Sequence, residues 1–158
     1  MPKITPFLWF DNQAEEAMNF YTSIFTDSKV GKVSRYGKSF PDKEGQVMTA
    51  TFELFGQEFM ALNGGPLFSF TEAVSFFVHC EDQHEVDYYW DRLTADGGKE
   101  SRCGWLKDKF GLSWQIIPNA LTEMLSDKDP QKASRVMHSM LTMSKIDIDT
   151  LRQVREGN

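Results

Sequence analysis

The sequence predicts a mixed α+β fold in which a strand–helix–strand unit is used twice and is followed by helices. Short aromatic segments at 4–10 and 74–80 indicate strands, and an amphipathic helix pattern follows each of them. An apolar stripe at helical spacing close to the C-terminus is the third observation. The repeated order indicates one structural unit that occurs twice along the chain.

The first unit begins with the aromatic run at 4–10, where a strand is expected. Asn12 offers an N-cap for the helix, and Glu15 three residues later completes a start that resembles a capping box. The apolar side chains that follow have the spacing of one helical face: Ala14, Ala17, Met18, Tyr21, Ile24 and Phe25. Further strands are expected at 29–36, 47–55 and 58–63, with a hairpin turn at 56–57.

The second unit repeats this order after the strand at 74–80. Asp82 and Glu85 mark a helix start, and the glycines at 97–98 mark its end. The helical face between them consists of Val86, Tyr89, Trp90 and Leu93. Strands at 100–106 and 112–117 flank a turn at 108–111. Tyr89 lies 69 residues after Phe20, as Leu93 does after Ile24. The pattern alone leaves two interpretations open: an internal duplication, or two unrelated helices that each carry an aromatic pair, which is common in cores.

The C-terminal segment is expected to be helical. Residues 120–125 fit one helix, 127–130 interrupt it, and Pro130 suits the first turn of the next. The apolar stripe consists of Ala133, Val136, Met137, Met140 and Leu141, and it continues with Ile148, Leu151 and Val154. Two interpretations stay open: the stripe packs on the sheet of its own chain, or it forms a subunit interface, where methionine is frequent.

Composition narrows the classes of function. The 158 residues, 41% of them hydrophobic, fit one domain or two small modules that share a core. A net charge of −6 without a cluster of basic residues argues against a nucleic-acid partner. Neither a secretory leader nor a membrane-spanning segment is expected, so Cys80 and Cys103 are expected to be reduced thiols in the cytoplasm.

Five segments together resemble the PhnB-like proteins of the vicinal-oxygen-chelate superfamily, which includes glyoxalase I, bleomycin-resistance proteins and extradiol dioxygenases. The segments are FDNQAEEAMNFYTSIF, ALNGGP, DQHEVDYYWDRL, CGWLKDKFGLSWQIIPN and MLTMSKIDI. They extend over nearly the whole chain, from residue 6 to residue 148, and CGWLKDKFGLSWQIIP is the most specific of them. Members of this group often carry the label 3-demethylubiquinone-9 3-methyltransferase.

The resemblance implies two βαβββ modules, each with a mixed sheet that curls into a half-open cup: the glyoxalase/bleomycin-resistance fold. The modules are expected at about 1–66 and 67–118, which makes 1–118 the paired part. Residues 119–158 then form a helical C-terminal extension that packs on the modules or contributes to a dimer contact. Two modules, from one chain or exchanged between chains, are expected to face each other across a small-molecule cleft, and the expected assembly is a homodimer.

Metal-using members of the superfamily place His or Glu at inward strand positions. The resemblance puts Phe7, Ser75 and Gln115 at three of these positions, and the remaining one falls near 61–63, where no carboxylate stands. Such neutral groups are poor ligands for a divalent cation, so no metal and no other cofactor is expected. His79, on the same strand face as Ser75, is either a ligand from a displaced set or a structural residue.

The expected cleft combines aromatic walls with a few polar groups. Cys103, beside Arg102, is either a reactive cleft thiol or a buried inert one. The amides of Asn63 and Gln115 either hydrogen-bond a ligand or support the structure. The residues expected to line the cleft are Phe7, Trp9, Asn63, Ser75, Phe77, His79, Cys103, Trp105 and Gln115.

Two functions therefore remain. The first is a protein that binds, and sequesters, a small molecule in an apolar cleft without the usual metal. The second is an enzyme of the same superfamily, either metal-dependent through His79 or metal-free through Gln115, Asn63 and Cys103. Methyl transfer is disfavoured, because an adenosyl methyl donor usually lies at a glycine-rich turn between a strand and a helix, whereas 64–66 lead toward another strand.

Overall fold

The computed structural model describes residues 2–157. The chain divides into two compact units, 1–70 (unit 1) and 71–158 (unit 2). The finer division at about 66 and 118 that the resemblance implied stays a prediction. Within residues 2–157, no helix has both the length and the hydropathy that crossing a membrane would require.

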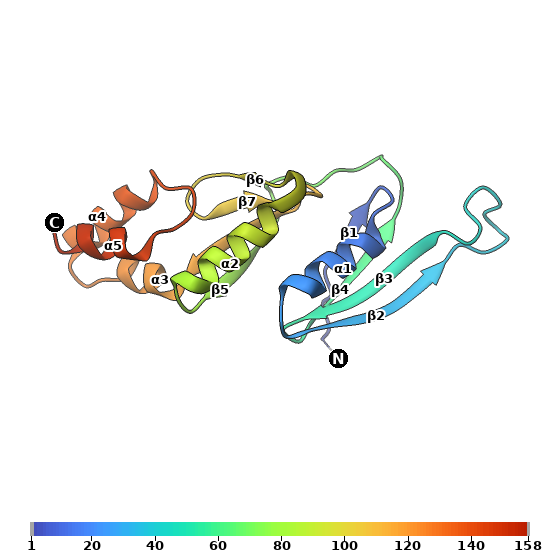
Figure 1. The fold of residues 1–158 in the computed structure, drawn as a ribbon, viewed down its shortest axis with the longest axis horizontal. Helices are drawn as coiled ribbons and strands as arrows, with labels where there is room; N and C mark the ends of the chain where they lie inside the picture. The colour runs from blue at the N-terminus through green and yellow to red at the C-terminus, as the bar shows by residue number, and fades with distance from the viewer. Residues whose placement is uncertain (1, 158) are drawn as a thin grey trace. The chain divides into compact units, whose positions relative to one another are not determined.

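Unit 1 is a βαβββ module (Figure 1). Its elements are β1 (Phe7–Phe10), α1 (Ala14–Ile24), β2 (Ser28–Arg35), β3 (Val47–Leu54) and β4 (Gln57–Asn63). The sheet has the strand order β1-β4-β3-β2. β1 runs parallel to β4, and the other neighbours are antiparallel, so the sheet is mixed, as expected.

The core of unit 1 lies between α1 and one face of this sheet. Tyr21 on α1 contacts the ring of Phe52 on β3, and Phe52 stacks on Phe59 with ring centroids 5.3 Å apart. All three side chains are buried. The predicted helical face is confirmed, since each of its apolar residues from Ala14 to Phe25 is buried, and this burial stabilises the helix on the sheet.

The expected start of α1 is wrong in its capping residue. Gln13, not Asn12, is the N-cap, and its side chain makes no cap hydrogen bond. The backbone N–H of Ala14 instead donates to Oδ1 of Asn63 at the end of β4, over 2.8 Å. A residue distant in sequence therefore caps the helix, which a local capping pattern cannot reveal.

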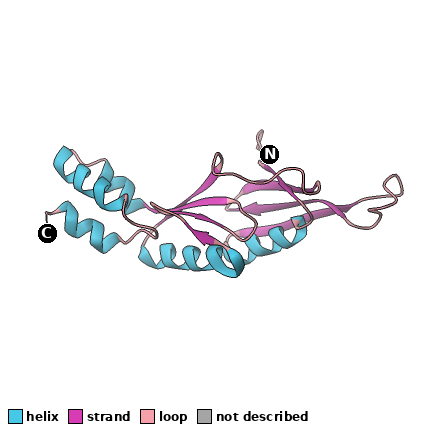
Figure 2. Ribbon diagram, turned by 90° about the horizontal axis from the view of Figure 1, so that it is seen from above, coloured by secondary structure: helices cyan, strands magenta, loops and turns pink. Residues whose placement is uncertain are grey.

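Unit 2 begins with a second βαβββ module of the same topology (Figure 1). Its elements are β5 (Ser75–Cys80), α2 (Gln83–Thr94), a short 3₁₀ turn η1 (Ala95–Gly97), β6 (Lys99–Glu100), β7 (Trp105–Lys107) and β8 (Ser113–Pro118). The strand order β5-β8-β7-β6 and the parallel β5–β8 pair match those of unit 1. Figure 2 shows that in each unit the helix runs along one side of its sheet.

The start of α2 confirms the sequence prediction. Asp82 is the N-cap, and its carboxylate accepts a hydrogen bond from the N–H of Glu85 over 2.9 Å. The Glu85 carboxylate in turn accepts from the N–H of Glu81 over 2.8 Å. Trp90, 69 residues after Tyr21, is buried against the sheet as Tyr21 is, so the repeated pattern corresponds to equivalent helices.

The strand expected at 100–106 is interrupted. β6 ends at Glu100 and β7 begins at Trp105, and the backbone between them turns through Cys103 (φ 59°) and Gly104 (φ 83°). Two backbone hydrogen bonds of 2.8 Å hold this turn, from Cys103 N–H to the carbonyl of Met143 and from Gly104 N–H to that of Ser144. The C-terminal segment therefore fixes a turn inside the module.

Three helices complete unit 2: α3 (Asn119–Leu125), α4 (Pro130–Met140) and α5 (Ile148–Arg155). A buried cluster joins them to the end of β8 and consists of Ile117, Leu121, Met124, Val136, Ile146 and Leu151. The predicted stripe on α4 thus packs mainly through Val136, whereas Met137 and Leu141 are exposed. Pro130 occupies the first turn of α4, as predicted.

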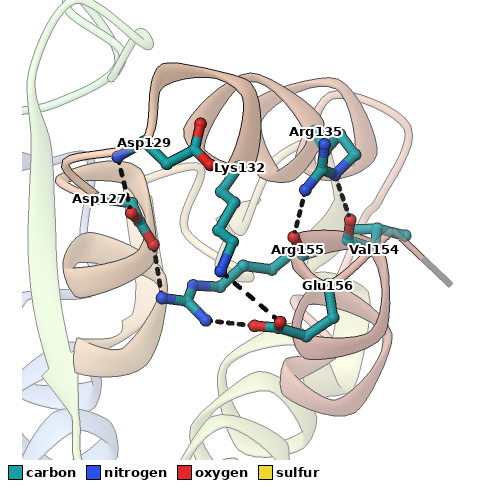
Figure 3. Close-up of polar contacts among 7 residues, drawn as sticks. All are labelled: Asp127, Asp129, Lys132, Arg135, Val154, Arg155 and Glu156. Atoms are coloured by element: carbon teal, nitrogen blue, oxygen red, sulfur yellow. Dashed lines mark hydrogen bonds and ion pairs between the residues drawn. The ribbon is translucent and has the colours of Figure 1, made fainter.

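Polar contacts close the far end of this helical bundle (Figure 3). The Arg135 guanidinium donates to the carbonyl oxygens of Val154 and Arg155, which are exposed at the end of α5, over 2.9 and 2.7 Å. Arg155 itself pairs with Asp127 over 2.5 Å and with Glu156. The two Arg135 hydrogen bonds thus add side-chain donors to carbonyls in the last turn of α5.

The segment between α4 and α5 also binds to α2. The side-chain amide of Gln83 donates to the carbonyl of Ile146 over 2.9 Å and accepts from the N–H of Ile148 over 2.8 Å. Lys145 pairs with Asp87 over 2.9 Å. The C-terminal helices are therefore an integral part of unit 2.

Candidate functional site

Each sheet has one face that its own helix does not cover, which we call the open face. In unit 1, alternation along the strands defines it by Phe7, Trp9, Thr49, Thr51, Glu53, Glu58, Met60 and Leu62. The intervening residues, among them Leu8, Ala50 and Phe52, are buried under α1. Phe7 lies directly beside Met60, and Trp9 lies beside Leu62.

The aromatic residues expected at the cleft lie on this open face. Phe7 is 50% exposed, an unusual position for a phenylalanine in the first strand of a sheet. Trp9 is held in place, because its indole N–H donates to the carbonyl of Gly65 over 2.9 Å and Phe68 contacts its ring edge-to-face at 4.9 Å. The open face of unit 1 thus has an aromatic and aliphatic part on β1 and β4, in which Trp9 is fixed, beside threonines and glutamates on β3 and β4.

Asn63, by contrast, does not lie on the open face. It alternates with Leu62, and its side chain points toward α1, where Oδ1 accepts from Ala14 and Nδ2 donates to the carbonyl of Val47 over 3.1 Å. It lines a cavity of about 590 Å³ within unit 1, together with Arg35 and Tyr36. The structure therefore places Asn63 apart from Phe7 and Trp9, in a supporting position.

In unit 2 the open face is defined by Lys99, Trp105, Lys107, Ser113, Gln115, Ser75, Phe77 and His79. Three of the expected cleft residues form one row across three strands, since Gln115 is the register partner of both Phe77 and Trp105. Nε2 of Gln115 also donates to the hydroxyl of Ser75 over 3.0 Å. Trp114 points the other way and is buried, as its alternation with Gln115 predicts.

His79 lies at the exposed end of the same face. Its imidazole contacts the ring of Phe77, with centroids 4.7 Å apart. The register partner of His79 is Ile117, which belongs to the buried cluster of the C-terminal helices. The geometry gives His79 an aromatic neighbour, and it gives no second imidazole or carboxylate beside it on β5 or β8.

The two cysteines differ in their surroundings. Cys80 is fully buried, and burial, together with the carboxylates of Glu85 and Asp82, raises the pKa of its thiol to about 12. It therefore stays protonated and unreactive at neutral pH. Cys103 lies in the strained turn before β7, next to the Met143 carbonyl, and not on the open-face row of Trp105, Gln115 and Phe77.

The donor groups on the open faces do not fit the metal site of the superfamily. The positions available on β1, β4, β5 and β8 carry aromatic, aliphatic, hydroxyl and amide groups, with Glu58 and His79 as the exceptions. Glu58 accepts a hydrogen bond from Thr5. Across residues 2–157 no group of three or more His, Cys, Asp or Glu side chains is placed to hold an ion. These donors therefore do not form a three-ligand site for a divalent cation.

The two glycines after β4 have a packing role. A Cβ at Gly64 would overlap the Trp9 ring, and Gly65 adopts φ 92° while its carbonyl accepts from the Trp9 indole. The chain then continues to β5 without a helix. The strand–turn–helix arrangement that cradles a nucleotide is thus missing between β4 and β5.

Sequence reasoning missed Ser113, a further polar residue on the open face of unit 2. Ser113 is only 1% exposed, and its hydroxyl has no hydrogen-bond partner among the described residues. It lines a cavity of about 320 Å³ with Trp105, Lys107, Lys99 and Glu72. The signal in the sequence was weak, because a serine at the start of a strand is common and its burial depends on neighbouring strands.

Two βαβββ units with the same strand order and an uncovered sheet face are the architecture of the glyoxalase/bleomycin-resistance fold, and they define a protein of the vicinal-oxygen-chelate class. A sequence profile of the family described as 3-demethylubiquinone-9 3-methyltransferase matches residues 2–117. The chain therefore belongs to this family, the PhnB-like group that the sequence resembled. The profile ends before α3, so the C-terminal helices lie outside the matched region.

Solved structures agree with this assignment. A PhnB protein from Bacillus cereus is 43% identical, with a TM-score of 0.67, and the match covers 74% of this chain and 99% of that one. A protein from Pseudomonas aeruginosa (19% identity, TM-score 0.61, 75% and 98% covered) shares the fold. So does the fosfomycin resistance protein FosX from Listeria monocytogenes, solved with Mn(II) and sulfate (17% identity, TM-score 0.54, 79% and 97% covered). No curated protein matches the chain significantly.

Proposed function

We propose that this protein binds a small molecule on the open faces of its two modules, and that it does so without a bound transition metal. The observation that carries the proposal is the row of Phe77, Gln115 and Trp105 across β5, β8 and β7. Aromatic walls with one positioned amide are typical of a pocket for a largely apolar ligand. Phe7 and Trp9 give unit 1 a comparable surface.

Binding and sequestration is favoured over catalysis for a chemical reason. Lyase, isomerase and dioxygenase reactions of the superfamily need a cation that polarises the substrate, and the open faces offer neutral groups at the positions of its ligands. The alternative, an enzyme that uses His79 with a displaced ligand set, requires stoichiometric metal. The methyltransferase name of the family describes a reaction for which residues 64–75 provide no nucleotide cradle.

The proposed assembly is a homodimer, in which open faces that are exposed in one chain become covered. Exposed large apolar side chains such as Phe7 (50%) and Phe77 (43%) favour this arrangement. The small molecule would then lie against these faces.

Enrichment of ligands from a cell extract tests the proposal. The purified protein is incubated with a small-molecule extract and re-isolated by size exclusion, and released compounds are identified by mass spectrometry. We expect a compound enriched on the wild type and on Phe40→Ala, an exposed control at the β2–β3 loop, but not on Phe77→Ala or Gln115→Ala. Circular dichroism checks that each variant is folded.

Elemental analysis of the same samples tests the metal statement. We expect clearly less than one transition-metal ion per chain. One metal ion per chain that disappears in His79→Ala would favour the enzyme instead. In the enrichment experiment, equal amounts of the bound compound on all variants would exclude the open face of unit 2 as the binding surface.

A further inference from the structure

We infer that the cavity beside Trp105 is a subsite for an anionic group, a carboxylate on a planar molecule, and that Glu72 occupies this subsite when no ligand is bound. The inference rests on the proposed function, since it names the kind of ligand that the open face of unit 2 takes. The residues that carry it are Lys99, Lys107, Ser113, Trp105 and Glu72.

Two lysines lie next to each other on this face. Lys99 on β6 and Lys107 on β7 are direct register partners in an antiparallel pair. Like charges opposite each other destabilise a sheet unless an anion lies near them. Lys107 has such an anion in Glu72, with which it forms an ion pair, and within residues 2–157 the structure gives Lys99 no ion pair. The cavity thus holds two ammonium and two carboxylate groups, and among the described residues only Lys107 has an ion pair there, which leaves the Lys99 ammonium available to a ligand anion.

The orphan hydroxyl lies in the same row. Ser113 on β8 is the register partner of Lys107 on one side and of Ser75 on the other. Its Oγ is buried and makes no hydrogen bond within the described chain, although it lines the cavity. A buried hydroxyl without a partner is unfavourable, because it has lost its hydrogen bonds to water. An oxygen atom of a ligand in the cavity would accept the missing hydrogen bond.

Glu72 lies at the same cavity and supplies the carboxylate that pairs with Lys107. It is located in the turn before β5, and its contact with Lys107 on β7 crosses β8, the strand that carries Ser113. The Lys107 ammonium lowers the pKa of the Glu72 carboxyl, so this carboxylate is charged at neutral pH. Both side chains are partly exposed, at 39% for Lys107 and 62% for Glu72, and such pairs contribute little to stability. A ligand carboxylate can therefore replace Glu72 without unfolding the module.

The positive charge and not the negative one is fixed by the sheet. Lys107 lies on a strand whose register sets its position beside Ser113, whereas Glu72 lies outside regular structure. The other carboxylate at the cavity, Glu100, accepts a hydrogen bond from the Trp90 indole over 2.6 Å. The Glu72 carboxylate is therefore the group that can move. A ligand that takes its place beside Lys107 is expected to be an anion as well. The Trp105 ring next to this row provides a surface for a planar body.

Benzoate and benzyl alcohol are suitable probes, because they share a ring and differ in the anionic group. Each is titrated into the ¹⁵N-labelled full-length protein, and the indole N–H signal of Trp105 and the amide signals of Lys107 and Ser113 are followed. We expect benzoate to shift these signals and to bind more tightly than benzyl alcohol, with a difference that decreases at high salt.

Three variants test the assignment. Glu72→Gln removes the competing carboxylate and should tighten benzoate binding severalfold, with little effect on benzyl alcohol. Ser113→Ala should weaken benzoate about tenfold, since a hydrogen bond to a charged group is lost. Asp87→Asn is the matched control, because it removes a carboxylate on α2 that pairs with Lys145 away from the cavity. It should change the affinity neither for benzoate nor for benzyl alcohol.

The outcomes separate this inference from the proposed function. Equal affinity for both probes, or a Glu72→Gln variant that binds benzoate no better than the wild type, overturns the anion subsite and leaves the binding face intact. Absence of any shift on the open face of unit 2 with either probe contradicts both. Because Glu72 is exposed, its variant is expected to fold even if Ser113→Ala does not.

Discussion

Single residues link parts of unit 1 that are distant in sequence, and Asn63 is the strongest case. Its one side chain caps α1 through the N–H of Ala14 and binds the carbonyl of Val47 at the start of β3. Its backbone carbonyl also accepts from the hydroxyl of Tyr36 over 2.8 Å. A helix, a strand and the β2–β3 loop therefore depend on this residue at the end of β4.

We expect Asn63→Ala to lower the free energy of unfolding by about 2 kcal/mol, because it removes a helix cap and leaves a partly buried carbonyl without its donor. Asn12→Ala, which removes the cap that the local sequence suggested, should change it by less than about 0.5 kcal/mol. Urea denaturation followed by circular dichroism measures both. A larger loss for Asn12 than for Asn63 would contradict the capping geometry.

The site could be predicted from sequence only to the extent that strand alternation decides it. A period of two puts Phe7, Trp9, Phe77 and Gln115 on uncovered faces, and their expected role in a cleft stays a prediction. The surroundings of Asn63 and Cys103 could not be read in this way, since a strand end and a turn depend on partners far along the chain. Ser113 and Glu72 went unnoticed, because neither burial nor an ion pair between a turn and a distant strand is visible in a local pattern.

At the scale of elements, the conformation of the turn between β6 and β7 depends most clearly on tertiary contacts. Cys103 and Gly104 both have positive φ, and the backbone carbonyls of Met143 and Ser144 hold them there. Helices were predicted well, since their spacing and caps are local, as at Asp82. The strand expected at 100–106 failed at this turn, because residues about forty positions away determine it.

We expect Gly104→Ala to destabilise the protein by about 3 kcal/mol. The new Cβ would lie 2.6 Å from Cδ1 of Ile117 and 3.0 Å from the carbonyl oxygen of Ile116. An L-residue at positive φ costs roughly 1–2 kcal/mol, and overpacking adds roughly 1–3 kcal/mol.

Gly111→Ala is the matched control for this prediction. Gly111 has a similar φ of 87°, but a Cβ there meets nothing within 4 Å, so only the backbone penalty of roughly 1–2 kcal/mol applies. Thermal unfolding and urea denaturation compare the two variants. Equal decreases in the free energy of unfolding would show that the turn at Gly104 accommodates the added methyl group and is not tightly packed against the C-terminal segment.

At the scale of the whole molecule, the open faces decide the assembly. We expect the wild type to have twice the mass of one chain in size-exclusion chromatography with light scattering. Phe7→Asp or Phe77→Asp should weaken the dimer by a factor of about 30 or more, because buried aromatic anchors often contribute about 2 kcal/mol or more to an interface. Phe40→Asp, on an exposed loop, should leave the mass unchanged. A monomeric wild type would refute the proposed homodimer.

Besides the buried cluster, main-chain atoms of the segment between α4 and α5 attach the C-terminal helices to the module. The carbonyls of residues 143, 144 and 146 and the N–H of residue 148 make these contacts. Substitutions at 143 and 144 leave those atoms in place, whereas Ile146 and Ile148 also have buried side chains, and an insertion or deletion would shift every one of these atoms. Among homologous proteins, the segment 143–148 should thus vary in amino acid at its exposed positions and keep a constant length.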